Sequence, residues 1–218
     1  MTLSARVMKR RFLVLSLFAT STVALGAGVA LAATLPPEVA PIESLDSALI
    51  ATMKAADAKV SFAERFGTLK PVLERVYDLP EILAISVGLF WSTLPPAQKT
   101  TLQSLFTEYT VATYVKSFDH FNGQRFEIQP TVRSLGARRI VTTNLIAADG
   151  QKTRLDYVMT PSSGTWKITD VLFDGTISKV ATQRSDFSGL VEPGNATRLI
   201  DALRKKITVL SDGALKVG

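Results

Sequence analysis

One stretch, residues 155–178, most strongly limits the folds open to this chain. Its sequence is LDYVMTPSSGTWKITDVLFDGTIS, in which side chains alternate along two segments joined by Pro-Ser-Ser-Gly at 161–164. A period of two predicts a strand on each side, and proline and glycine between them favour a turn. Asp174-Gly175 predicts a second turn. A lone hairpin is marginally stable in water, so the rest of the chain is expected to cover it.

Before the hairpin, apolar residues first recur every three or four positions, the spacing of amphipathic helices. The predicted helices cover residues 42–60, 62–77, 80–91 and 94–121. Ser44 and Ser61 are the expected N-caps of the first two. Gly67 and Pro71 predict a break or kink in the second helix near residues 69–70, and the third helix is apolar on almost every side, which predicts burial.

After Asn122-Gly123, which predicts the end of the long helix, the period falls to two. Strands are predicted at 126–128, 132–135 and 139–147, and helical spacing returns at 199–210. Consecutive strands joined by tight turns favour an antiparallel meander. The predicted fold class is therefore α+β, with a curved antiparallel sheet of four or more strands packed against several helices.

The first 32 residues are typical of a secretory signal peptide. Four basic residues precede the apolar stretch Phe12–Ala24, and Ala30-Leu31-Ala32 matches the small-residue cleavage pattern. We expect cleavage near Ala32, export to a bacterial periplasm and a single domain over residues 33–218. An uncleaved membrane anchor is the alternative, because apolar and small residues continue to Ala33.

Export changes the meaning of the net charge of +6. The predicted leader holds four of the 25 Lys and Arg residues and none of the 19 Asp and Glu residues, which leaves +2 on the remaining chain. Nucleic-acid binding requires a basic surface, so it loses its main support and no nucleic-acid partner is expected. The absence of cysteine excludes disulfides and cysteine-ligated metal sites, and no cofactor is expected.

Side chains suited to catalysis are few. His120 is the only histidine, and its position near a helix end predicts an interaction with the last carbonyl groups. Motifs of serine hydrolases, zinc proteases and phosphate loops do not occur outside the leader. The remaining enzymatic alternative is a small-molecule enzyme that uses Asp170 and Asp174 as an acid and base pair. A structural role for both carboxylates is the simpler interpretation.

The predicted helices direct many aromatic and branched aliphatic side chains toward one sheet. An ordinary solid core is one interpretation, and it would suit a periplasmic adaptor that binds no ligand. The other interpretation is a cavity that holds an apolar ligand between the sheet and the helices. A 16-carbon chain gains about 12 kcal/mol on leaving water, at about 0.8 kcal/mol per methylene group, so such a cavity would hold a lipid strongly.

Seven short motifs, in chain order, carry a resemblance to a known family, and three longer segments carry a resemblance to one of its branches. The seven principal motifs are Tyr77-Asp78-Leu79-Pro80, Val87-Gly88-x-x-Trp91, Leu94-Pro95-Pro96-x-Gln98, Phe106-x-x-Tyr109 with Tyr114, Gly164-x-Trp166-Lys167-Ile168-x-Asp170-Val171, Asp174-Gly175-x-Ile177-Ser178 and Arg184-Ser185-x-Phe187. They resemble the MlaC/toluene-tolerance family of periplasmic carriers in bacterial phospholipid transport. Pro95 departs from the serine that the family often has before its proline, which alters the expected helix cap.

Three longer segments resemble the hopanoid-biosynthesis-associated branch of that family, called HpnM. They are Phe118-Asp119-x-Phe121-x-Gly123-x-Arg125-Phe126, Leu155-Asp156-Tyr157-Val158-Met159 and Val180-Ala181-x-Gln183-Arg184-Ser185-Asp186-Phe187. The resemblance implies a soluble, non-catalytic carrier whose apolar pocket, between the curved sheet and the helices, receives the tails of a phospholipid or a hopanoid. It also implies that the carrier hands its lipid to membrane-bound transport complexes.

The resemblance also indicates which positions include pocket-lining residues. These are Val76, Tyr77, Ile82, Ile85, Trp91, Phe106, Tyr109, Phe118, Leu145, Tyr157, Ile168 and Val171. Strict alternation places Ile168 and Val171 on opposite strand faces, so the sequence leaves open which face lines the pocket. Arg184 is expected either to contact a head group or to pair with Asp170 or Asp174.

Overall fold

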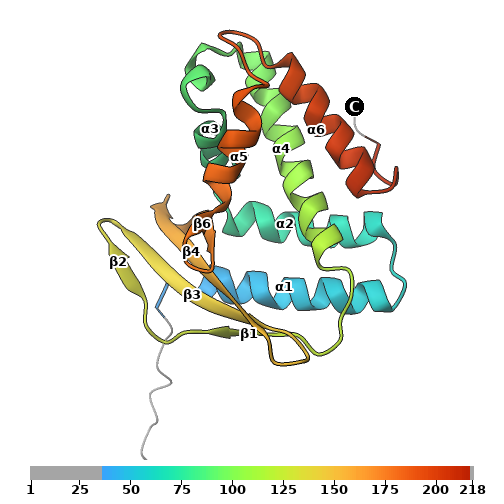
Figure 1. The fold of residues 1–218 in the computed structure, drawn as a ribbon, viewed down its shortest axis with the longest axis vertical. Coiled ribbons are helices and arrows are strands. Elements are labelled where there is room, and N and C mark those ends of the chain that lie inside the picture. Colours follow the sequence, from blue (N-terminus) through green and yellow to red (C-terminus); the bar gives the residue numbers. More distant parts are fainter. Residues whose placement is uncertain (1–35, 217–218) are drawn as a thin grey trace, which may run out of the picture. The chain divides into compact units, whose positions relative to one another are not determined.

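The computed structural model describes residues 36–216 (Figure 1). The predicted signal peptide, residues 1–32, lies outside this range. Within it, none of the helices combines the length and the apolar character needed to cross a bilayer.

Within residues 36–216 the chain forms six α-helices, one 3₁₀ helix and six strands. The helices are α1 (Ala40–Asp57), α2 (Phe62–Val76), α3 (Leu79–Val87), η1 (Gly88–Thr93), α4 (Pro96–Ser117), α5 (Lys179–Ser188) and α6 (Thr197–Leu210). The strands are β1 (Arg125–Ile128), β2 (Arg133–Leu135), β3 (Arg138–Ile146), β4 (Lys152–Ser162), β5 (Thr165–Phe173) and β6 (Ile177–Ser178). The predicted α+β class is confirmed.

The predicted N-cap of α1 is wrong, and that of α2 is confirmed. Helix α1 begins at Ala40 with proline in its first turn, so Ser44 lies inside the helix and accepts a hydrogen bond from Arg75 (3.0 Å) instead. Ser61 caps α2 through a reciprocal pair of bonds, in which its Oγ accepts from the Glu64 N–H (3.2 Å) and its own N–H donates to Glu64 (3.1 Å). This capping box satisfies two donors that a helix start otherwise leaves free.

Replacing Ser61 with alanine is expected to lower the free energy of unfolding by about 1 kcal/mol, because the first turn of α2 loses its cap. Urea denaturation followed by tryptophan fluorescence measures the change. Ser185→Ala is the control, since Ser185 lies within α5 and its hydroxyl makes no hydrogen bond among the described residues. An equal effect of the two substitutions would contradict the role of the cap.

Two predicted features of the middle helices are wrong. Helix α2 continues through Pro71 without a break, because residues on both sides, including Leu69 and Leu73, are anchored in the core. Helix α3 ends at Val87 rather than near residue 91, since Gly88 has a φ of 74° and starts the separate helix η1. Leu89 in η1 is 84% exposed, so the predicted burial holds only for α3.

The long helix α4 ends at Ser117, before the predicted end near residue 121. Phe118 leaves the helical conformation and stacks on Tyr114, with 6.0 Å between the ring centroids. The following residues are held by α1, since the Phe121 N–H donates to Asp57 (3.0 Å). Asn122-Gly123 therefore lies in the connection to β1 and does not end the helix.

All strand pairs in the sheet are antiparallel. The strand order is β1-β3-β4-β5-β6, and β2 pairs with β3 beside β1. The sheet is open and curved, and the helices stand against it (Figure 1). The predicted antiparallel meander is confirmed. The segments predicted at 126–128 and 132–135 form the short strands β1 and β2, which both pair with β3.

The hairpin of β4 and β5 differs from strict alternation in one place. Its turn is Ser163-Gly164, both with positive φ (47° and 80°), the combination that tight hairpins favour. Val158 pairs with Asp170 but Met159 pairs with Ile168, so β5 carries an extra residue. Such a bulge brings residues three apart onto one face. Ile168 and Val171 therefore lie on the same face of β5, whereas strict alternation places them on opposite faces.

Four helices pack on β5, and the long helix α4 packs chiefly on other helices. Helices α1, α2, α3 and α5 each contact β5, whereas α4 packs chiefly on α2, α3 and α6. Buried side chains such as Leu73, Leu83 and Leu102 join the helices, while Met159 and Ile168 belong to the sheet. A link fixes the end of α2 to the sheet, since the Asp78 N–H donates to the Ile168 carbonyl (2.9 Å).

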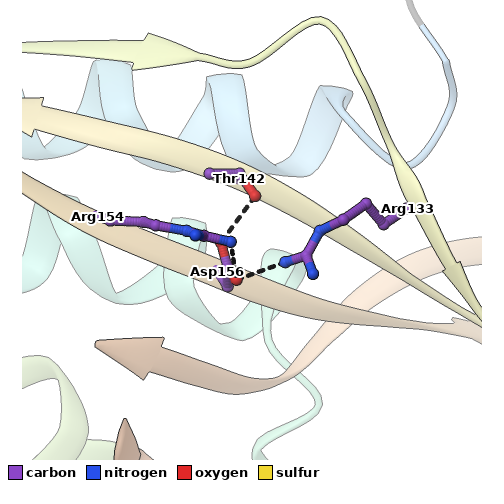
Figure 2. Close-up of polar contacts among 4 residues, drawn as sticks. All are labelled: Arg133, Thr142, Arg154 and Asp156. Carbon is purple, nitrogen blue, oxygen red and sulfur yellow. Dashed lines mark hydrogen bonds and ion pairs between the residues drawn. The ribbon is translucent and has the colours of Figure 1, made fainter. Parts of the chain in front are cut away.

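The buried carboxylate of Asp156 joins three residues (Figure 2). Asp156 alternates with Leu155 and Tyr157 along β4, so its side chain lies on the opposite face of the sheet. Asp156 accepts bonds from Arg154 Nε (3.0 Å) and Nη2 (2.8 Å) and from Thr142 Oγ1 (2.7 Å), and Arg133 pairs with it from β2. Burial raises the pKa of Asp156, but these hydrogen bonds and the two arginine charges outweigh burial and lower it. The carboxylate is therefore ionised at neutral pH.

Candidate functional site

A cavity of about 270 Å³ lies between α4 and the sheet. Its wall is mainly apolar and includes side chains from four helices (α1, α3, α4 and α5) and three strands (β3, β4 and β5), together with the residues that directly follow α2 and α4. The lining residues are Leu49, Tyr77, Leu79, Ile82, Phe106, Tyr109, Thr110, Thr113, Tyr114, Ser117, Phe118, Leu145, Thr153, Leu155, Tyr157, Asp170, Val171, Phe173, Lys179, Val180 and Gln183. Concave, mainly apolar sites of this kind with a few polar groups are typical of small-molecule binding.

Helix α4 forms one wall of the cavity through a single stripe. The stripe runs from Phe106 to Ser117 in steps of three and four residues, so every member faces the same side of the helix. The hydroxyl groups of Thr110 and Thr113 donate to the carbonyls of Phe106 (2.8 Å) and Tyr109 (2.7 Å) in the same helix. Because these hydroxyls are already bonded, the wall is less polar than its composition indicates.

The sheet forms the opposite wall through pairs of directly opposed residues. Leu145 lies opposite Thr153, Leu155 opposite Phe173, and Tyr157 opposite Val171. Phe173 is 41% exposed, so it stands where the cavity reaches solvent. These pairs lie on one face of the sheet, and the bulge in β5 places Ile168 on the same face. A single apolar surface therefore extends from the cavity into the core.

Three of the tyrosines that line the cavity are Tyr77, Tyr114 and Tyr157. The hydroxyls of Tyr77 and Tyr114 are hydrogen-bonded to each other, and their ring centroids are 6.0 Å apart. Burial raises the pKa of Tyr114 to about 12, and it raises the pKa values of Tyr77 and Tyr157 well above the usual value. All three hydroxyls are therefore neutral at physiological pH, which suits an apolar ligand.

Comparison with known proteins bears on this architecture. A family model described as MlaC protein matches residues 43–205, which is most of the chain. The chain belongs to the MlaC family. Its fold is similar to the solved structure of a phospholipid-binding protein from Ralstonia solanacearum in complex with a phospholipid, with a TM-score of 0.69 and 20% sequence identity. The match covers 81% of the present chain and 99% of the other.

Most of the positions predicted from the resemblance lie at the cavity of this MlaC-family protein. Those that line it are Tyr77, Ile82, Phe106, Tyr109, Phe118, Leu145, Tyr157 and Val171. Val76 and Ile168 are buried in the adjacent core, and Trp91 is in η1, away from the lining. Ile85 lines a second, more polar cavity of about 380 Å³ between α3, α5 and the β4–β5 hairpin.

Several lining residues of the MlaC-family cavity were not predicted, and simple spacing would have found some of them. Thr110, Thr113, Tyr114 and Ser117 continue the helical stripe of Phe106, and Leu155 is two residues before Tyr157 on the same strand face. Leu49, Leu79, Thr153, Phe173, Lys179, Val180 and Gln183 come from elements whose placement the sequence did not give.

The two carboxylates of the enzymatic alternative differ in their surroundings. Asp170 Oδ1 accepts from the N–H groups of Val171 (2.8 Å) and Val180 (3.1 Å), and its Oδ2 accepts from Ser178 Oγ. Asp174 is exposed in the β5–β6 turn with a φ of 50° and is not part of either cavity wall. Asp170 thus holds the start of α5 against β5, and the two residues form no acid and base pair.

The expected ion pair of Arg184 and the expected contact of His120 are not found among the described residues, and the alternative of a head-group contact for Arg184 stays a prediction. Arg184 is exposed, lines the second cavity and forms no ion pair with Asp170 or Asp174 in the described structure. It packs closely on Gly88, where an added Cβ would lie 3.4 Å from its Nε. His120 Nδ1 bonds Asp57 (2.7 Å) at the end of α1 and does not contact the α4 carbonyls. Its hydrogen bond lowers the pKa of Asp57.

Proposed function

We propose that this protein is a non-catalytic, periplasmic lipid carrier that shuttles phospholipid or hopanoid between bacterial membranes. The observation that carries the proposal is the apolar cavity between α4 and the sheet, which is lined by side chains from seven separate helices and strands. The phospholipid bound by the Ralstonia solanacearum protein supports a lipid ligand. The signal peptide predicted at residues 1–32 supports a place in the periplasm.

The proposed mechanism is encapsulation. Apolar side chains replace water around the lipid tails, and each buried methylene group contributes about 0.8 kcal/mol. The polar part of the lipid lies toward solvent near the exposed Phe173. Release requires the α4 wall to move away from the sheet, which leaves the strand hydrogen bonds intact because α4 packs chiefly on other helices. Membrane-bound transport complexes are the proposed partners in this exchange.

Two alternatives receive less support. An enzyme that uses Asp170 and Asp174 would need a free carboxylate near bound substrate, but Asp170 is committed to three hydrogen bonds and Asp174 lies outside the cavity wall. An adaptor without a ligand would need a solid interior, which the cavity of about 270 Å³ does not provide.

Native mass spectrometry with lipid extraction tests the proposal on protein purified from the periplasm of a hopanoid-producing host. We expect one lipid per chain, and its mass distinguishes phospholipid from hopanoid. The adaptor alternative predicts a lipid-free chain, and that result for protein isolated without detergent would overturn the carrier proposal.

Filling the cavity is expected to reduce lipid binding by about tenfold. The substitution Thr113→Trp places an indole on the lining stripe of α4, and excluding two methylene groups of a lipid tail costs about 1.6 kcal/mol. Thr100→Trp is the matched control, because Thr100 lies on the exposed side of the same helix and its hydroxyl bonds the carbonyl four residues earlier in the same way. Equal lipid content in both variants would count against the cavity as the binding site.

A further inference from the structure

The cavity wall contains two charged side chains among the described residues, Asp170 and Lys179. The three hydrogen bonds of Asp170 satisfy both of its oxygens from the protein itself. Lys179, by contrast, forms no ion pair or hydrogen bond within residues 36–216, although its side chain is partly buried. The wall therefore presents one cation without a protein partner.

The position of Lys179 is unfavourable for the stability of α5. It is the first residue of that helix, whose first turn contains no acidic residue. The amino end of a helix carries a partial positive charge, so a lysine there is repelled and an acidic residue would be favoured. The dipole of α5 thus gives no reason for a lysine at this site, whereas a ligand that bears a negative charge does.

The location of Lys179 also fits the polar end of a lipid. It follows β6 directly, and β6 pairs with β5 so that Ile177 lies opposite Phe173. Phe173 and Ile177 are 41% and 59% exposed, which places this pair where the cavity meets solvent. The tyrosine cluster is the buried part of the same wall. A lipid with its tails among the tyrosines would have its head group near the Lys179 ammonium group.

We propose that Lys179 binds the phosphate of a phospholipid head group and so selects anionic phosphate-bearing lipids over uncharged lipids with the same tails. This inference rests on the proposed carrier function and narrows its ligand. A charge-assisted hydrogen bond to phosphate in a partly exposed site corresponds to about a tenfold preference. A hopanoid without an anionic group would gain nothing from this contact.

The test compares two probes that differ only in the phosphate-containing head group. Dihexanoyl phosphatidylglycerol and dihexanoylglycerol are titrated into delipidated protein, and binding is measured by native mass spectrometry. We expect the wild type to bind the phosphatidylglycerol about tenfold more tightly. Lys179→Gln should bind both probes with the lower affinity, while Lys179→Arg keeps the preference. Lys205→Gln, an exposed substitution on α6, should behave as the wild type.

Each outcome separates this inference from the carrier function. If Lys179→Gln keeps the wild-type preference, or if the wild type binds both probes equally, Lys179 is not the phosphate contact and the carrier function stands. If the wild type binds neither probe, both this inference and the phospholipid form of the carrier proposal fail. Thermal unfolding of each variant establishes that the substitution leaves the fold intact, and the helix dipole predicts that Lys179→Gln is no less stable than the wild type.

Discussion

Replacing Asp46 with asparagine is expected to raise the free energy of unfolding at pH 8 by up to about 4 kcal/mol. Asp46 lies in α1, one turn before Leu49 of the cavity wall, and it is 7% exposed. Neither of its carboxylate oxygens has a hydrogen-bond partner among the described residues. Burial, together with the charge of Glu43, raises the pKa of Asp46 from 3.8 to about 7. One pKa unit corresponds to about 1.4 kcal/mol, which sets the upper value.

The direction of the pH dependence follows from this raised pKa. Because the folded protein holds the proton more tightly than the unfolded chain, the stabilising contribution is complete below pH 3.8 and is lost as the pH rises through about 7. The asparagine side chain carries no charge, so the variant should keep its stability over this range. The buried amide group of the asparagine also lacks hydrogen-bond partners, and its desolvation offsets part of the gain. The value of about 4 kcal/mol is therefore an upper limit.

Urea denaturation at pH 5 and pH 8 measures the effect of the Asp46 substitution. The difference between variant and wild type should be small at pH 5 and large at pH 8. Asp186→Asn is the matched control, because Asp186 is exposed on α5 and its carboxylate forms no hydrogen bond or ion pair within residues 36–216. A variant that gains nothing at pH 8 would show that Asp46 finds a partner or water in solution.

Replacing Asp156 with alanine is expected to have the opposite effect, a loss of about 3 kcal/mol at neutral pH. The carboxylate is 1% exposed and is held by Arg133, Thr142 and Arg154 (Figure 2). Its removal leaves two guanidinium groups facing each other without their shared anion. Because each arginine side chain is 47% exposed, water compensates part of the loss, which places the effect at the lower end of the range for broken buried pairs.

The pH dependence of the Asp156 contribution also has the opposite sign. Its folded pKa is lowered, so the contribution is present above the unfolded value of 3.8 and disappears as the pH falls through the folded pKa. Urea denaturation at pH 7 and pH 3 should show the variant and wild type converging in acid. A double-mutant cycle with Arg154→Met isolates the pair energy. A cost no larger than that of Asp186→Ala at pH 7 would mean that desolvation cancels the attraction.

The sequence predicted the fold class because hydrophobic period is a local property that the folded chain retains. The change from helical to alternating spacing near Gly123 correctly separated the helices from the sheet, and Ser61 was recognisable as a cap. Element ends were less predictable because they depend on contacts made elsewhere. Phe118 leaves α4 to stack on Tyr114, and Asp57 of α1 holds the chain that follows.

The residues of the cavity wall were predictable only in α4 and β4, where the spacing of apolar side chains is regular. The stripe of α4 and the alternation of β4 are regular, whereas the bulge in β5 moves Ile168 onto the face of Val171. A bulge of this kind leaves no mark in an alternating sequence. Asp46 was missed for a related reason, since a single aspartate beside Leu45 reads as the polar side of a helix until three-dimensional packing encloses it.

The unequal attachment of the two cavity walls also bears on how this protein evolves. The sheet wall is fixed by backbone hydrogen bonds and by the Asp156 network behind it, so most changes there disturb folding. The α4 wall consists of side chains on a helix that packs chiefly on other helices. Substitutions along the stripe from Phe106 to Ser117 can therefore resize the cavity for a different ligand while the folding determinants stay the same. Related chains that bind different ligands are expected to differ in amino-acid sequence first along this stripe.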